Sequence, residues 1–280
     1  MSESNVTVYV EVFNEESRIE SCLKSFSWAD ELVVFDKCST DMTREIASKY
    51  ATQLITVPNT PASENIIENF SKCKITEWLF VATASSLIHP KLVDEIIKLT
   101  TDENFKYDVI AVPYAMHAFG INNKNSPWTN LRKNSIIRSS VLSLSCELHN
   151  EITYNSDRVF EMPLMAPDEA LYHCTHKNAG DFFSRHMRYV NYEAQYQHSQ
   201  LGKQQLKKSF IDIFRAIATV LIKRRTFMLG WDGIALSLAY VSYFIMKFIY
   251  VWDVNRENGD VVYPELRKKI DRLWDSERNN

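Results

Sequence analysis

The first hundred residues alternate short apolar runs with segments in which apolar positions recur at helical spacing. The apolar runs are rich in β-branched residues and cover residues 6–13, 31–35, 54–57, 78–82 and, further on, 109–114. Helical spacing covers residues 18–26, 42–50, 64–74 and 90–99. Strands that alternate with helices over short connections form parallel sheets with helices on both faces. The pattern therefore predicts an α/β fold with a mainly parallel sheet, joined late in the chain by antiparallel strands at 135–146 and 152–154.

One apolar run ends abruptly in small hydroxyl residues. Residues 77–82 are followed by Thr83, Ala84, Ser85 and Ser86, none of which is charged. In open α/β sheets, ligands bind beyond the carboxyl ends of the strands. The sequence therefore places an uncharged hydroxyl cluster where a ligand is expected.

The last third of the chain has a different character, so we divide the chain into residues 1–180 and a helical extension, 181–280. Residues 203–225 hold seven Lys or Arg and one acid, Asp212, with apolar residues on one helical face. Residues 227–252 are mostly apolar, but only fourteen, 233–246, separate Asp232 from Lys247. Because a bilayer span needs about 20 apolar residues, this count disfavours a span. A helix in the membrane interface and a helix buried against the domain both remain open, and the basic segment suits an anionic lipid surface.

Composition narrows the class of protein. The 280 residues carry a formal net charge of −3, which gives no general reason to bind nucleic acid. Six glycines provide no Gly-rich phosphate loop, and the N-terminus lacks the basic segment of a secretory signal. Five cysteines without C-x-x-C spacing disfavour a disulfide framework and a structural zinc site, and the cluster His173, Cys174, His176 is an incomplete zinc ligand set. We expect a cytoplasmic protein, with peripheral contact to the inner face of the membrane and homo-oligomer formation as further options.

Several motifs resemble family 2 glycosyltransferases, specifically the branch similar to lipopolysaccharide core-sugar transferases. The matching segments are Asn14-Glu15-Glu16, then residues 28–36, then Ser39-Thr40-Asp41-Met42-Thr43, and then Glu77-Trp78. Weaker similarity continues at His149-Asn150-Glu151, His176, Arg188-Tyr189, Glu193-Ala194 and 230–233. The resemblance implies a GT-A fold, a Rossmann-like nucleotide-binding sheet joined to an acceptor region.

The resemblance also implies roles for residues at the predicted strand ends. Asp36 is expected to accept hydrogen bonds from the base or ribose of a nucleotide sugar, with Asn14 and Glu15 lining the same pocket. A turn-capping Asp is the structural alternative for Asp36. The family normally carries Asp-x-Asp after the fourth strand to hold a divalent cation, and here Thr83 and Ser85 occupy those positions. We therefore expect no metal cofactor, and a cationic side chain that stabilises the diphosphate instead; the candidates are Arg132, Lys133, His149 and Arg185.

The resemblance points to Glu151 as the general base, because an acid beside a His precedes the acceptor region in that family. Asn150 separates His149 from Glu151 here, and Glu147, Asp168 and Glu169 are reserves. The expected function is an inverting glycosyltransferase that moves a sugar, most simply from a UDP-sugar, to a glycan or lipid-linked acceptor without a metal. The alternatives are a catalytically inactive relative that acts as a binding or scaffold protein, and a nucleotide- or acceptor-binding module of a larger assembly.

Overall fold

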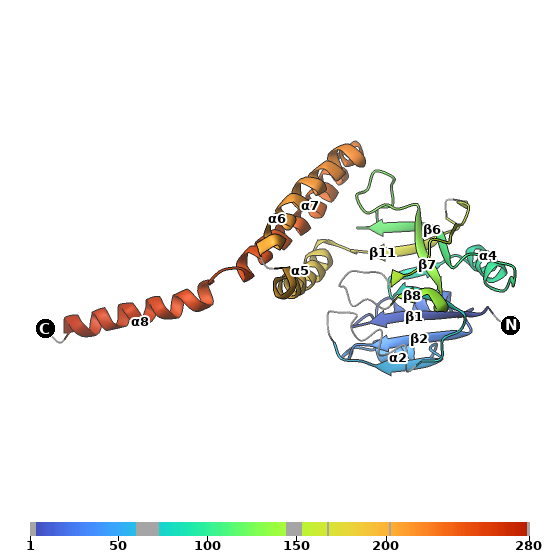
Figure 1. The fold of residues 1–280 in the computed structure, drawn as a ribbon, viewed down its shortest axis with the longest axis horizontal. Helices are drawn as coiled ribbons and strands as arrows, with labels where there is room; N and C mark the ends of the chain where they lie inside the picture. Colours follow the sequence, from blue (N-terminus) through green and yellow to red (C-terminus); the bar gives the residue numbers. More distant parts are fainter. Residues whose placement is uncertain (1–3, 60–72, 144–152, 167, 202, 279–280) are drawn as a thin grey trace. The chain divides into compact units, whose positions relative to one another are not determined.

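A computed structural model describes residues 4–59, 73–143, 153–166, 168–201 and 203–278 (Figure 1). The chain divides into two compact units. Unit 1 comprises Met1–Lys124 and Trp128–Ala179, and unit 2 comprises Asn125–Pro127 and Gly180–Asn280.

Unit 1 is built on a nine-stranded sheet (Figure 1). The strand order is β3 (Gln53–Thr56), β2 (Glu31–Asp36), β1 (Val6–Val12), β4 (Trp78–Thr83), β7 (Arg132–Arg138), β6 (Val109–Ala118), β11 (Leu171–Thr175) and β5 (Ser86–Ile88), with β10 (Val159–Glu161) paired to β6. β7 runs antiparallel to both of its neighbours, and β5 runs antiparallel to β11; the other pairs are parallel. β8 (Leu142–Ser143) and β9 (Thr153–Tyr154) form a separate antiparallel pair. The central strands are buried on both faces, as their apolar runs require.

Three described helices and one short 3-10 turn complete unit 1: α1 (Ile19–Ser25), α2 (Thr43–Ala47), α4 (Pro90–Thr100) and η1 (Ser139–Val141). α4 begins where Pro90 occupies the first turn and the His89 side chain accepts a hydrogen bond from the Lys91 amide. It buries Leu92 and Ile96 in the main core, to which the strands contribute side chains such as Trp78.

Unit 2 is helical. It contains α5 (Ala179–Leu201), α6 (Lys203–Ala218), the π-helical turn η2 (Thr219–Lys223), the 3-10 turn η3 (Thr226–Leu229), α7 (Gly230–Val254) and α8 (Gly259–Arg278). Asn125 joins this unit through its side-chain amide, which donates to the Arg224 carbonyl at 2.6 Å.

The turn before α7 depends on a glycine. A Cβ added at Gly233 would lie 1.9 Å from the Thr226 carbonyl oxygen, so only glycine lets the first turn of α7 approach η3 this closely.

The segment Thr226–Val254 is long and apolar enough to cross a membrane, with a mean hydropathy of 1.7, although only 11% of its most apolar window is buried. The length argument against a span is therefore wrong. It counted residues between Asp232 and Lys247, whereas α7 continues through both for 25 residues, about 37 Å of helix. Within unit 2, the other helices leave much of α7 exposed.

The predicted fold class is confirmed: an α/β architecture with a mainly parallel sheet, flanking helices and a helical C-terminal part. The strands expected at the start of the chain are present within a few residues, and the antiparallel strand expected from residue 135 is β7, which begins at Arg132. Most of the helix expected at 64–74, and the end of the strand region expected at 135–146, lie outside the described residues.

Candidate functional site at the carboxyl ends of the strands

The predicted site residues of unit 1 meet at one edge of the sheet. β1, β2 and β4 are parallel, with Val12 beside Asp36 and Glu11 beside Thr83, so their carboxyl ends share this edge. β7 runs antiparallel to β4, so its first residues, Arg132 and Lys133, lie at the same edge. The parallel strands thus gather Asn14, Glu15, Asp36, Thr83 and Ser85 at one edge, and antiparallel β7 brings two of the candidate cations toward them.

Asn14 joins the loop after β1 to the loop after β2, and Asp36 orders the second of these loops. Asn14 has a φ of 53°, a left-handed conformation that Asn tolerates, and its side-chain oxygen accepts a hydrogen bond from the Thr40 amide at 2.8 Å. The Asp36 side chain is buried; one oxygen accepts from the Ser39 amide at 3.0 Å, and the other lies 3.4 Å from Arg44 Nη1. The bond to Ser39 is the turn-capping interaction named as the alternative for Asp36. It leaves the second oxygen with one long contact.

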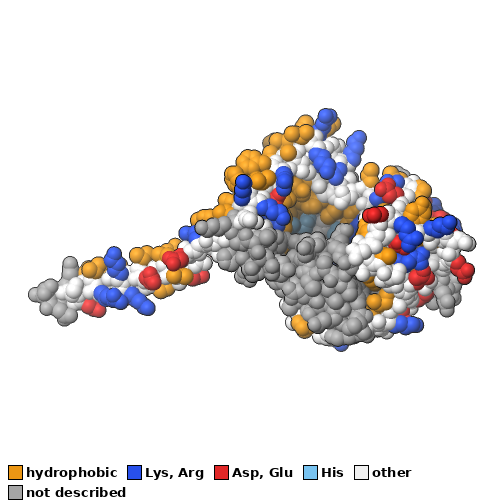
Figure 2. All heavy atoms as spheres, in the orientation of Figure 1, with side chains coloured by type: hydrophobic (Ala, Val, Ile, Leu, Met, Phe, Trp, Pro, Cys, Tyr) orange, Lys and Arg blue, Asp and Glu red, His pale blue; other side chains and the backbone are white. Residues whose placement is uncertain are grey.

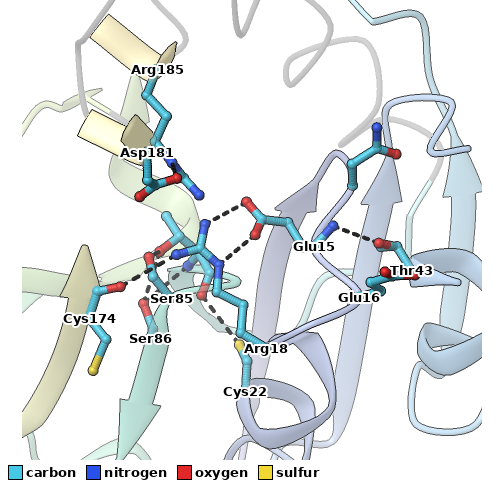
Figure 3. Close-up of polar contacts among 12 residues, drawn as sticks. Glu15, Glu16, Arg18, Cys22, Thr43, Ser85, Ser86, Cys174, Asp181 and Arg185 are labelled. Atoms are coloured by element: carbon cyan, nitrogen blue, oxygen red, sulfur yellow. Dashed lines mark hydrogen bonds and ion pairs between the residues drawn. The ribbon is translucent and has the colours of Figure 1, made fainter. Parts of the chain in front are cut away.

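Glu15 and Arg18 form an ion pair after β1, at the start of α1 (Figure 3). Arg18 donates from Nε at 2.5 Å and from Nη2 at 2.7 Å to the two oxygens of Glu15. Its third nitrogen, Nη1, lies 3.4 Å from the Cys174 carbonyl oxygen on β11. Arg18 therefore lies between the end of β1 and β11, a cation that the sequence reasoning did not consider.

Hydroxyl groups and an imidazole cluster at the end of β4. Thr83 Oγ1 lies 2.8 Å from Ser85 Oγ, and His173 Nδ1 lies 3.4 Å from each of these oxygens. Ser86 Oγ accepts from the Thr83 amide at 3.2 Å. The register of β11 against β5, with His173 beside Ser86, holds the imidazole there. Sequence reasoning considered His173 only as a zinc ligand and so missed this position.

The other histidine of that segment has different surroundings. His176 is buried, with its ring 5.9 Å from Phe119 and 5.8 Å from Trp128. Residues 173 and 176 therefore do not form a common metal-binding cluster.

Cys22 supports the end of β4 from α1. Its thiol donates to the Thr83 carbonyl at 3.3 Å, and burial raises the pKa of this thiol to about 12. Cys22 is therefore a protonated donor at neutral pH rather than a nucleophile.

Lys133 approaches the same cluster through an aromatic ring. Its ammonium lies 5.8 Å from the centroid of the Tyr114 ring, and that ring stacks on His173 at 6.2 Å. Arg132 instead turns toward β10, with Nε donating to the Met162 carbonyl at 2.7 Å and Nη1 lying 3.4 Å from Glu161. Of these two candidates, Lys133 is the one that reaches the ring stacked on His173.

The remaining predicted residues lie elsewhere or outside the described chain. Glu169 precedes β11 and pairs with Lys91 of α4, which lowers the pKa of its carboxyl. The carbonyl oxygen of the neighbouring Asp168 accepts a hydrogen bond from the Tyr172 hydroxyl at 2.5 Å. Arg185 belongs to α5 of unit 2, where it pairs with Asp181 at 2.7 Å. Glu147, His149 and Glu151 lie outside the described residues.

The family model described as "Glycosyl transferase family 2" matches residues 7–149, about half of the chain. The chain belongs to glycosyl transferase family 2. It is thus a glycosyltransferase, and its sheet with a helical extension is of the GT-A type.

Individual relatives are distant. A protein of Rickettsia bellii (strain RML369-C), named "Uncharacterized glycosyltransferase", is 24% identical over 249 residues, which cover 84% of this chain and 82% of the relative. Among solved structures, S. aureus TarS 1–349 is 16% identical, covers 89% of this chain and 90% of its own, and has a TM-score of 0.46. Glucosyl-3-phosphoglycerate synthase from Mycobacterium tuberculosis, in complex with Mn²⁺, UDP and glucosyl-3-phosphoglycerate, is 22% identical. That match covers 40% of this chain and 44% of the synthase, with a TM-score of 0.32.

The residues at the end of β4 do not fit the divalent cation that the family 2 resemblance implies. Thr83 and Ser85 offer neutral hydroxyls that hydrogen-bond to each other, and His173 adds a nitrogen, whereas Mg²⁺ and Mn²⁺ prefer carboxylate and other oxygen ligands. Within the described ranges, no three His, Cys, Asp or Glu side chains are grouped closely enough to hold a metal ion.

Proposed function

We propose that this family 2 enzyme is an inverting glycosyltransferase that moves a sugar from a UDP-sugar to a glycan or lipid-linked acceptor without a divalent metal. The observation that carries the proposal is the cluster of Thr83, Ser85 and His173 at the end of β4, with Lys133 and Arg18 on neighbouring strands and loops. Hydrogen-bond donors and cations can do there what a bound cation does for a leaving diphosphate. We place the enzyme in the cytoplasm.

The nucleotide is assigned to the loops after β1 and β2. The second Asp36 oxygen, 3.4 Å from Arg44, can accept a hydrogen bond from a base or ribose. The bonds that join Asn14 to Ser39 and Thr40 hold the two loops in one arrangement before a ligand arrives. Such preorganisation reduces the ordering cost of binding.

The leaving group is assigned to the edge formed by Arg18, Lys133 and the hydroxyl cluster. When the bond between the anomeric carbon and the diphosphate oxygen breaks, negative charge grows on the nucleoside diphosphate. The Arg18 guanidinium and the Lys133 ammonium supply positive charge, and the hydroxyls of Thr83 and Ser85 supply hydrogen bonds. An imidazole N–H of His173 can donate to the same oxygens.

Glu151 is our proposed general base. Its carboxylate takes the proton of the acceptor hydroxyl while that oxygen attacks the anomeric carbon from the face opposite the diphosphate. The new bond joins the sugar to the acceptor oxygen with inverted configuration at the anomeric carbon, and the nucleoside diphosphate departs with the electron pair of the broken bond.

A second candidate function is a catalytically inactive, sugar-nucleotide-binding relative. It is favoured by the same replacement of carboxylates by Thr83 and Ser85, since a chain that has lost a metal site can also have lost transfer.

Calorimetric titration tests donor binding and its metal dependence, and release of nucleoside diphosphate from the bound donor in the presence of an acceptor then separates the enzyme from the inactive relative. The full chain is titrated with a panel of UDP-, GDP- and TDP-sugars, first in EDTA and then with Mn²⁺ or Mg²⁺. We expect one donor to bind with the same affinity in both buffers. Binding that requires Mn²⁺ would contradict metal independence, and no binding of any nucleotide sugar would remove the enzyme proposal.

The base is tested with Glu151→Gln. We expect donor binding to persist and transfer to fall by about 10²-fold or more, which is the usual contribution of general base catalysis. Glu103→Gln, a carboxylate in an exposed loop, is the matched control and should keep full activity. Full activity in Glu151→Gln would show that Glu151 is not the general base and would leave Glu147, Asp168 and Glu169 as the alternative candidates.

We also propose that the enzyme contacts the membrane peripherally through unit 2, which suits a lipid-linked acceptor. A homo-oligomer formed through another surface is compatible with this contact.

A further inference from the structure

An apolar stripe runs along the exposed side of α7. Its members recur at spacings of three, four and seven residues and are all well exposed: Trp231 (85%), Ile234 (45%), Leu238 (67%), Ile245 (42%), Ile249 (49%) and Trp252 (43%). At 100° per residue they fall within a single sector of the helix, whereas Asp232, Lys247 and Asp253 fall outside it. The stripe is therefore apolar for the whole length of α7.

The preceding segment carries a second apolar stripe, on a helix that also bears exposed cations. Phe210, Phe214, Ile217 and Leu221 recur along α6 and η2 and are 37 to 58% exposed. Lys207, Lys208 and Arg215 also lie on the exposed surface of α6. In Figure 2, hydrophobic side chains gather over these helices with Lys and Arg side chains beside them.

α6 and α7 form an antiparallel hairpin. The Phe210 ring on α6 lies 5.6 Å from the Phe248 ring near the far end of α7, while Gly233 at the start of α7 touches Thr226 of η3. The first stripe residue of α6 therefore lies beside α7, and the turn that joins the helices holds Lys223, Arg224 and Arg225 together with exposed Ile222, Phe227 and Met228.

We propose that the α6–α7 hairpin lies in the plane of an anionic lipid surface, with both stripes in the headgroup region and Lys207 and the turn cations near lipid phosphates. The inference deepens the membrane contact of the proposed function. An anionic bilayer fits because it offers apolar and negatively charged groups to one face. A second copy of this face would set seven Lys or Arg against seven more, with only Asp212 in the segment to offset them.

The packing of the hairpin also decides between lying on the bilayer and crossing it. If α7 spanned the membrane, α6 would be drawn into the hydrocarbon with Lys207, Lys208 and Arg215. Each cation at the bilayer centre lowers the insertion equilibrium by roughly a hundredfold. In the interface the same cations stay hydrated near the lipid phosphates, so the hairpin lies flat.

The test is co-sedimentation of the full chain with vesicles of phosphatidylcholine alone or with about 30% phosphatidylglycerol. The variant Trp231→Ser with Leu238→Ser removes the two most exposed stripe residues. Leu266→Ser with Trp274→Ser is the matched control, because it changes the same residue types, 50% and 61% exposed, on α8. We expect wild type and control to bind anionic vesicles at least tenfold better than neutral ones, and the stripe variant to lose tenfold or more. Alkaline carbonate should release bound protein from the pellet.

Several outcomes would overturn the inference. These are no binding of wild type to anionic vesicles, equal losses in the stripe variant and its control, or protein that stays in the pellet through carbonate, which indicates a span. A wild-type dimer that dissociates in the stripe variant, with vesicle binding unchanged, would assign the stripe to a second copy. Circular dichroism and nucleotide-sugar titration of each variant establish that it is folded. Because vesicle binding is measured without turnover, it can fail while the proposed transferase activity holds, and the reverse is also possible.

Discussion

At the scale of single residues, the ion pair between Arg18 and Glu15 determines how a positive charge is oriented at the candidate site. Glu15 fixes the guanidinium through two hydrogen bonds, and the third nitrogen lies toward β11, whose His173 meets the hydroxyls of Thr83 and Ser85. A pair held in this way is oriented before any ligand arrives, which is what electrostatic stabilisation of a leaving group requires. Loss of the cation would also leave the Glu15 carboxylate facing a diphosphate.

Arg18→Met is therefore expected to weaken UDP binding by tenfold or more. A charge-assisted hydrogen bond contributes about 1.5–3 kcal/mol, and the exposed Glu15 charge adds repulsion. Uridine binding should change little, because it carries no phosphate. Calorimetry with UDP, UMP and uridine compares the affinities of the variant and wild type for ligands with two, one and no phosphates. Lys124→Met, which removes an exposed cation elsewhere, is the matched control. Equal losses for UDP and uridine would show that Arg18 supports the pocket as a whole.

Asp108 offers a pH-dependent prediction. Burial by itself raises the pKa of this carboxyl, but hydrogen bonds from Ser156 at 2.5 Å and from Arg158 at 2.6 and 2.8 Å outweigh it, so the pKa lies below its ordinary value. A carboxyl with a lowered folded-state pKa stabilises the protein above its unfolded pKa, about 3.9, and the contribution is lost as pH falls through the folded value.

Asp108→Asn should thus lower the free energy of unfolding by about 2 kcal/mol at pH 7, and the gap to wild type should narrow below about pH 4. Urea unfolding at pH 7 and pH 3 measures both values. Asp94→Asn, an exposed change on α4, should be close to neutral at either pH. A gap that stays constant with pH would contradict the role of the Asp108 charge.

At the scale of elements, strand periodicity predicted the sheet and its site edge. Asn14, Asp36 and Thr83 could be placed together because parallel strands bring their carboxyl ends to one edge, a consequence of local pattern and right-handed crossovers. Arg18 and His173 could not be placed. The contact of Arg18 with Cys174 joins residues 156 positions apart, and the contact of His173 with Thr83 joins residues 90 positions apart. Both contacts depend on the pairing of β11 with β6, which the periodicity of the sequence does not predict.

For the C-terminal helices, the prediction failed because it considered the order of residues along the chain and not their positions around a helix. Asp232 and Lys247 interrupt an apolar run when residues are counted in a line, yet on a helix both fall outside the sector of the apolar stripe. Angular position, rather than the length of the run, decides what α7 presents to its surroundings.

Gly233→Ala tests the hairpin turn. The added methyl group would meet the Thr226 carbonyl, a backbone atom, so η3 and α7 must separate; we expect a loss of about 2 kcal/mol in the free energy of unfolding. Gly259→Ala is the control, because the three atoms nearest its added Cβ belong to the side-chain ring of Tyr263, which can rotate away. Thermal and urea unfolding compare the two, and similar small changes in both would mean that the turn relaxes without cost.

At the scale of the whole molecule, charge is distributed unevenly. The chain carries −3 overall, yet the segment 203–225 holds seven Lys or Arg against one acid, so all of the net negative charge belongs to the rest of the chain. A negatively charged lipid surface attracts the first part and repels the second. In the proposed membrane contact, this polarity favours an orientation with the hairpin toward the lipid, and it makes the binding sensitive to ionic strength.

The last prediction follows from that polarity. Replacing Lys207 and Lys208 by Gln removes two exposed cations of α6, each worth about 1 kcal/mol near an anionic surface, so vesicle binding should fall by roughly tenfold or more at low salt. The fall in wild-type binding as NaCl rises from about 50 to 500 mM should be steeper than that of the variant, since screening acts on fewer charges. Lys268→Gln with Lys269→Gln removes a matched pair of exposed lysines from α8 and should keep wild-type affinity and slope. If the α6 variant and the α8 variant lose vesicle binding equally, the attraction depends on the total charge of the protein. That result would contradict a specific role of the hairpin.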